Sequence, residues 1–172
     1  MKTHCFVLLF AVALFAIFPM YADEGWSCQD VTGVLMTDIG AITPGSINLG
    51  PAFGDLGGAV SAQILGQNND GSYNVQHYWI SKGGDVMKFQ QAVLHPVWVP
   101  GLNGVAAVPW GHYKAYLMQG GTGQWANVFG YIDCFGIADF NQLTLVLRYR
   151  GTICHKPAAP PGHVNSGHGA ME

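Results

Sequence analysis

The feature that most constrains this chain is a series of short segments in which apolar and polar residues alternate, each ended by a turn signal. The clearest alternation covers residues 72–81. One face of this segment carries Tyr73, Val75, His77 and Trp79. A period of two places successive side chains on opposite faces of a β-strand. The pair Asp70-Gly71 separates this run from the alternating run before it, which is typical of a tight hairpin. No window has a helical period, so we expect an all-β protein.

The same pattern predicts about eight strands. The expected strands cover residues 31–39, 59–65, 72–81, 85–94, 112–119, 124–129, 131–140 and 142–153. Residues 23–29 are interpreted as a leader. Two Gly- and Pro-rich stretches, residues 40–56 and 95–111, are predicted to be irregular connections, the second with a short edge strand at residues 97–99. Short strands at regular spacing predict a sandwich or a closed barrel.

Low charge favours the closed barrel. Only 10% of the residues are charged and 49% are hydrophobic, whereas about 25% are charged in typical globular domains. Charged residues usually guard exposed sheet edges, and a closed barrel has no such edges. We therefore expect an antiparallel barrel of about eight strands over residues 23–155, with part of its outer surface covered by self-association. A formal net charge of −3 argues against an electrostatic nucleic-acid surface.

Both ends of the chain differ from this barrel pattern. Lys2 precedes a wholly apolar run over residues 5–18, which predicts a secretory signal peptide over residues 1–22 with cleavage after Ala22. The run is too short to span a bilayer comfortably. The alternative is an uncleaved anchor, because Met20 is bulky for a cleavage site. Residues 156–172 are rich in Pro, Gly, His and Ser and are expected to be a disordered tail. The predicted product is exported and free of the membrane.

Three cysteines remain after cleavage: Cys28, Cys134 and Cys154. An exported protein can form disulfides, and an odd number leaves one thiol free. We expect Cys28 to pair with Cys154, because these residues lie near the two ends of the barrel segment. Cys134 would then be an inert buried thiol. A Cys134–Cys154 bridge is the alternative.

The most distinctive segment covers residues 120–130, GGTGQWANVFG. It contains Gly120, Gly121, Thr122, Gly123 and Gly130, and consecutive glycines permit tight turns with positive φ. The segment resembles the GGTG-aromatic motif of the dirigent and allene oxide cyclase barrel-like superfamily. Residues 147–154 look like the closing strand of its secreted bacterial members. The resemblance implies an eight-stranded barrel, usually a homotrimer, with a cavity open at one end. Plant dirigent proteins have an Arg where this chain has Phe129, so the family's catalytic residues are not carried over.

Candidate ligand-binding residues come from strand faces that a barrel turns inward. Tyr73, His77 and Trp79 share one such face, with His77 as a polar contact or proton carrier. The alternative for His77 is a surface or core-rim position. Arg148 would bind an anionic ligand if its face points inward, and would be solvated if that face is the outer wall. The spacing of the histidines matches no metal site, so no metal or cofactor is expected.

These observations favour an exported barrel that binds a small hydrophobic or aromatic molecule without conventional catalysis. One alternative is an isomerase or a director of stereoselective coupling, which a buried carboxylate or Arg in the cavity would favour. Another is a structural surface or matrix protein, which trimerisation with a packed interior and no pocket would favour.

Overall fold

The structure, a computed structural model, describes residues 25–118 and 120–156. It contains eleven strands and one short 3₁₀ turn, η1 (Gly123–Trp125). The strands are β1 (Ser27–Asp38), β2 (Ile47–Gly54), β3 (Gly58–Gln67), β4 (Tyr73–Ser81), β5 (Val86–Phe89), β6 (Ala92–Leu94), β7 (Val97–Trp98), β8 (Val105–Val108), β9 (Lys114–Met118), β10 (Val128–Asp139) and β11 (Thr144–His155).

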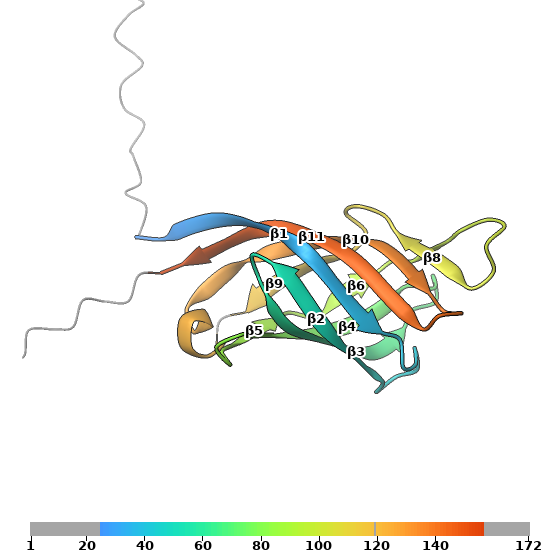
Figure 1. The fold of residues 1–172 in the computed structure, drawn as a ribbon, viewed down its shortest axis with the longest axis horizontal. Helices are drawn as coiled ribbons and strands as arrows, with labels where there is room; N and C mark the ends of the chain where they lie inside the picture. The colour runs from blue at the N-terminus through green and yellow to red at the C-terminus, as the bar shows by residue number, and fades with distance from the viewer. Residues whose placement is uncertain (1–24, 119, 157–172) are drawn as a thin grey trace, which may run out of the picture.

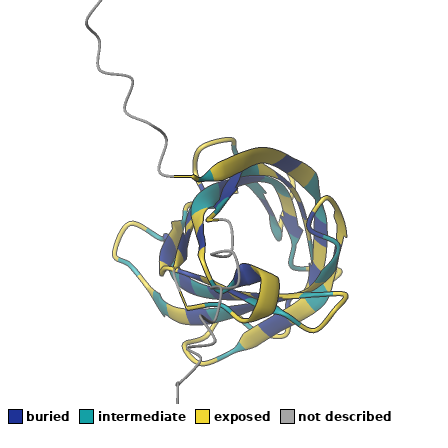
Figure 2. Ribbon diagram, turned by 90° about the vertical axis from the view of Figure 1, so that its left-hand side faces the viewer, coloured by how far each residue is buried: buried dark blue, intermediate teal, exposed yellow. Residues whose placement is uncertain are grey.

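Eight of these strands form a closed antiparallel barrel, as predicted (Figure 1). Around the ring the order is β11, β1, β2, β3, β4, β5, β9 and β10, and β10 pairs with β11 to close it. Strand β6 pairs with β4, and β7 and β8 extend the sheet beyond β10. The view along the barrel axis shows the closed ring (Figure 2).

Closure depends on the first and last strands. Strand β1 pairs with β11 from Ser27 opposite His155 to Asp38 opposite Thr144. Strand β11 pairs along its whole length with β10 on its other side. Because both edges of β11 are occupied, the sheet has no free edge at the point where it closes.

A disulfide joins Cys28 to Cys154, which lie directly opposite each other in the β1–β11 pair. This confirms the predicted pairing and excludes the Cys134–Cys154 alternative. Cys134 is a free thiol in the core. Burial, with a smaller contribution from the neighbouring Asp133 charge, raises the pKa of this thiol well above its usual range. The thiol therefore stays protonated and unreactive, as expected.

The face of β4 that was proposed to bind a ligand points inward. Tyr73, Val75, His77 and Trp79 are all buried. From β11, Leu147, Tyr149 and Ile153 are buried on the same inner side. The rings of Trp79 and Tyr149 meet edge to face with centroids 5.1 Å apart. Trp79 and the three β11 residues belong to the main hydrophobic core. Tyr73 and Val75 belong to a second, smaller cluster.

Five boundaries differ from the sequence prediction. The single strand expected at residues 85–94 is divided into β5 and β6. Residues 40–56 are not wholly irregular, since they contain β2. Pro51 is tolerated in this strand because it lies just beyond the last position paired with β1, so it interrupts no β1–β2 hydrogen bond. Residues 95–111 contain β8 as well as the expected edge strand. The strand expected at residues 124–129 is replaced by η1 and the start of β10. Part of the expected leader is strand, because β1 begins at Ser27.

The predicted signal peptide, residues 1–22, lies outside the described residues, and so does the predicted tail apart from Lys156. Within the described ranges, no helix is long and apolar enough to cross a membrane.

Replacing both Cys28 and Cys154 by Ala should lower the free energy of unfolding by about 3–5 kcal/mol, because the bridge closes a loop between residues 126 positions apart. Denaturant unfolding of the oxidised protein and the variant measures this difference. Cys134→Ala, which keeps the bridge, should cost less. A loss below about 1 kcal/mol in the double variant would show that the bridge adds little to barrel closure.

Candidate functional site

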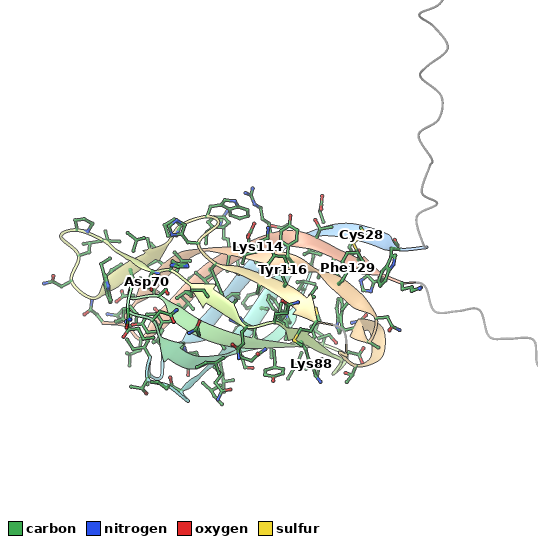
Figure 3. All side chains as sticks on the ribbon, turned by 180° about the vertical axis from the view of Figure 1, so that it is seen from behind. Cys28, Asp70, Lys88, Lys114, Tyr116 and Phe129 are labelled. Carbon is green, nitrogen blue, oxygen red and sulfur yellow. A yellow bond between two sulfur atoms is a disulfide. The ribbon has the colours of Figure 1, made fainter. Side chains whose placement is uncertain are left out.

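The three β4 residues predicted to bind a ligand face the interior at different depths. Tyr73 is the first residue of β4, and Trp79 lies six residues further along it. At about 3.4 Å per residue this separates their backbones by about 20 Å. Figure 3 shows the two ends of the barrel, with Cys28 at one and Asp70, just before Tyr73, at the other. Trp79 therefore lies towards the Cys28 end, and the three side chains do not form one pocket.

His77 is a core residue of the barrel. It is buried, and its ring shares a hydrogen bond with the hydroxyl of Tyr113, which is also buried. Desolvation lowers the pKa of His77 to about 4. The imidazole is therefore neutral at pH 7 and acts as a hydrogen-bonding core group.

Arg148 lies on the outer wall and is exposed. It is opposite Val34 on one neighbouring strand and Phe135 on the other. Arg150, two residues along the same face, stacks on the ring of Trp110. The structure therefore separates Arg148 from the three inward-facing β4 residues.

The glycine motif builds a cover at the Cys28 end of the barrel. The N–H of Thr122 donates to the carbonyl of Val86 at 2.9 Å, and the N–H of Val86 donates to Thr122 Oγ1 at 2.8 Å. Thr122 thereby anchors the segment to the start of β5. Gly123 has φ +52° and lies against Asp85, so a Cβ there would collide with the carboxylate. Gly130 lies within β10, opposite Ile153.

This cover places Trp125 at the mouth of the barrel. Trp125 is the last residue of η1, and its side chain is buried. Its ring lies 5.4 Å from the ring of His155 at the end of β11. Within the described ranges, no acceptor binds Trp125 Nε1. An unpaired buried N–H is costly.

Beside Trp125 lies an open pocket of about 400 Å³, which we call the mouth pocket. Five separate segments build it: the start of β1, the β2–β3 turn, the β4–β5 turn with its flanking strand ends, η1 and the end of β11. Its lining residues are Gln29, Gly54, Asp55, Leu56, Gly57, Trp79, Ser81, Lys82, Gly83, Met87, Gln124, Trp125 and His155. Figure 2 looks onto this end of the barrel. Leu56, Trp79, Met87 and Trp125 are its large apolar residues, and all four are buried, so each reaches the pocket with only a small part of its surface.

Tyr149 and Trp79 hold the β2–β3 turn in place from inside. The N–H of Leu56 donates to the hydroxyl of Tyr149 at 2.9 Å, and that hydroxyl donates to the carbonyl of Phe53 at 3.0 Å. Trp79 Nε1 donates to the carbonyl of Leu56 at 2.7 Å. Gly33 leaves room for the Tyr149 ring, since a Cβ there would collide with it. Burial raises the pKa of Tyr149, so the phenol stays protonated and keeps donating.

The charged groups of the mouth pocket lie at its rim. Asp55 is exposed, and its Oδ2 accepts the N–H of Thr32 at 2.8 Å. The Lys82 side chain lies across Gly57, and a Cβ added at residue 57 would be 3.6 Å from Lys82 Nζ. One acidic and one basic group thus leave the rim with little net charge. Among the described residues, no group of three His, Cys, Asp or Glu side chains is placed to hold a metal ion.

Of the residues proposed from the sequence to bind a ligand, only Trp79 lines the mouth pocket. Leu56, Met87 and Trp125 were not among the proposed site residues. The signal for Trp125 was present, because it is the aromatic residue of the glycine motif. Leu56 and Met87 have no local signal, since they join the pocket only when distant turns meet at the barrel end.

Comparison with solved structures finds a likeness in fold, whereas comparison of the sequence finds none. No family model matches the chain, and no curated protein matches it. Among solved structures, the chain is similar to the pterocarpan synthase dirigent protein GePTS1, with 13% sequence identity and a TM-score of 0.35. The match covers 80% of this chain and 90% of that one. Function is therefore argued from the site itself.

Acid should destabilise the barrel through His77. Its pKa is about 4 in the folded protein and about 6.5 when unfolded, so the unfolded chain binds the extra proton between these values. Stability should fall by about 3 kcal/mol as the pH drops from 6.5 to 4, and this contribution should then level off. Denaturant unfolding at several pH values measures the slope. His77→Gln should flatten it, and an unchanged slope in that variant would assign the effect to other groups.

Proposed function

We propose that this protein binds a small aromatic or otherwise apolar molecule in the mouth pocket, without conventional catalysis. The observation that carries the proposal is the pocket itself, an open volume of about 400 Å³ in which Leu56, Trp79, Met87 and Trp125 lie among glycine and polar residues. Ligand sites are typically concave and of about 300–1,000 Å³. Two indole rings and a thioether favour a flat ring.

The polar groups support positioning rather than bond-making. Tyr149 and Trp79 are engaged with backbone groups of the β2–β3 turn. Asp55 is exposed and accepts a backbone N–H. Asp133 is the buried carboxylate of the described residues, and it does not line the mouth pocket, where the isomerase alternative would require it. His77, the candidate proton carrier, is not among the residues that line the pocket.

We also propose that the protein is exported, as the predicted signal peptide indicates. The Cys28–Cys154 disulfide supports this, because such bonds persist in oxidising compartments.

Self-association is a further part of the proposal, as a homotrimer if the resemblance extends to assembly. Met36, Val146 and Ile137 are opposite one another across β1, β11 and β10 and are all exposed. An exposed row of this kind is typical of an interface. Val146→Glu should therefore shift the protein to a smaller species in analytical ultracentrifugation. If the unmodified protein sediments as a monomer at every concentration, this part of the proposal is wrong.

Blocking the mouth should abolish binding. Gly83 lines the pocket, and a Cβ there would lie 3.6 Å from Ser81 Oγ, so a larger side chain fits the fold. Gly83→Phe should weaken binding of methyl 4-hydroxybenzoate by at least about tenfold in isothermal titration, a change worth about 1.4 kcal/mol.

The matched control is Asn69→Phe, which adds the same side chain to the exposed turn between β3 and β4 at the opposite end. It should bind the ester like the unmodified protein. Equal affinity in both variants would place the ester elsewhere and refute the mouth pocket as the binding site.

A further inference from the structure

A second hollow adjoins the mouth pocket on the outer wall of the barrel. Its volume is about 490 Å³, and we call it the outer trough. Its lining residues are Pro51, Ala52, Phe53, Gly54, Gly57, Gly58, Ala59, Ile80, Ser81 and Lys82. Gly54, Gly57, Ser81 and Lys82 line the mouth pocket as well. The two hollows therefore meet over the β2–β3 and β4–β5 turns.

The trough arises because small residues lie between large ones. Its floor is the start of β3, where Gly57, Gly58 and Ala59 follow one another. Phe53 on β2 and Ile80 on β4 rise on either side of this floor and are 53% and 44% exposed. Ile80 is directly opposite Ala59. A Cβ at Gly58 would collide with the carbonyl of Ile80, so the floor cannot be raised there without moving β4.

Lys82 marks the junction between the two hollows. Its side chain lies over Gly57: if residue 57 had a Cβ, that atom would lie 3.3 Å from Lys82 Cε and 3.6 Å from Lys82 Nζ. A ligand that passes from the mouth pocket into the trough must cross this ammonium group. An oxygen atom at that point of the ligand would accept a charge-assisted hydrogen bond.

From this continuity we infer that the natural ligand is an elongated amphiphile. An aromatic head occupies the mouth pocket, an oxygen-bearing link lies beside Lys82, and an alkyl chain lies in the outer trough between Phe53 and Ile80. The inference rests on the proposed function, because it extends the ligand of the mouth pocket. In this proposal the exposed apolar residues of the trough, Phe53 and Ile80, contact the alkyl chain of that ligand.

The chain would be covered by protein on one side only. Full burial of a methylene is worth about a fourfold gain in affinity, so a chain covered on one side should gain about twofold per methylene. A head group without a chain should bind through the mouth pocket alone. Affinity should therefore rise with chain length, and the increase should depend on the trough.

The test uses the methyl, butyl and hexyl esters of 4-hydroxybenzoic acid, titrated calorimetrically below their aggregation concentrations. With the unmodified protein, the butyl ester should bind about eightfold and the hexyl ester about thirtyfold more tightly than the methyl ester. Ala59→Leu fills the trough from an exposed position and should leave the affinity for the methyl ester unchanged. It should also remove the gain with chain length.

Ser61→Leu is the matched control, since Ser61 lies two residues along the same face of β3 and outside the trough. It should keep the full chain-length gain, and thermal melts should show that both variants fold. If Ala59→Leu keeps the gain, or if the unmodified protein shows none, the chain does not lie in the trough and the inference is wrong. If no ester binds, the proposed function itself fails.

Discussion

The pairing of the first strand with the last is the interaction on which the rest of the structure depends. Strand β1 joins β11 along its whole length, and this contact turns a meander of short strands into a closed ring. Non-local pairing of this kind is entropically expensive because the intervening chain must be ordered. The Cys28–Cys154 bridge lies in the same pair and reduces that cost by restricting the unfolded chain. Without closure, β1 and β11 would expose free edges on a protein with few charges to guard them.

Closure also determines where a ligand can bind. The long side chains of Trp79, Tyr149 and Phe89 fill the ring, so the interior is largely a packed core. Space remains at the end where β1 and β11 meet η1. Tyr149 is central there, because its hydroxyl bonds both Phe53 and Leu56 and so fixes the turn that separates the mouth pocket from the outer trough. The same few contacts thus stabilise the closed end and shape both hollows.

The fold class was largely predictable from the sequence, because alternation and turn signals identify short strands. Alternation placed Tyr73, His77 and Trp79 on one face, and the Cys28–Cys154 pair followed from position along the chain. Strand β2 was missed because its Gly and Pro residues resemble a loop, and only its pairing with β1 and β3 makes it a strand. The mouth pocket was missed for a different reason. Leu56, Met87 and Trp125 come from three turns or strand ends that are far apart in the sequence. Closure of the barrel brings them together, and no short-range sequence pattern predicts that they will meet. Arg148 shows the same limit, since alternation alone does not say which face points inward.

The central claim is that a small aromatic molecule binds at the mouth pocket and nowhere else on the barrel. The chain has five tryptophans, and each gives its own indole N–H signal in a ¹H–¹⁵N spectrum. Trp79 and Trp125 line the mouth pocket, whereas Trp98 lies on the β7 extension and Trp110 stacks with Arg150 on the outer wall. On titration with methyl 4-hydroxybenzoate, the signals of Trp79 and Trp125 should shift together along one saturation curve while those of Trp98 and Trp110 stay in place. Shifts confined to Trp98 or Trp110, or none at Trp79 and Trp125, would contradict the account.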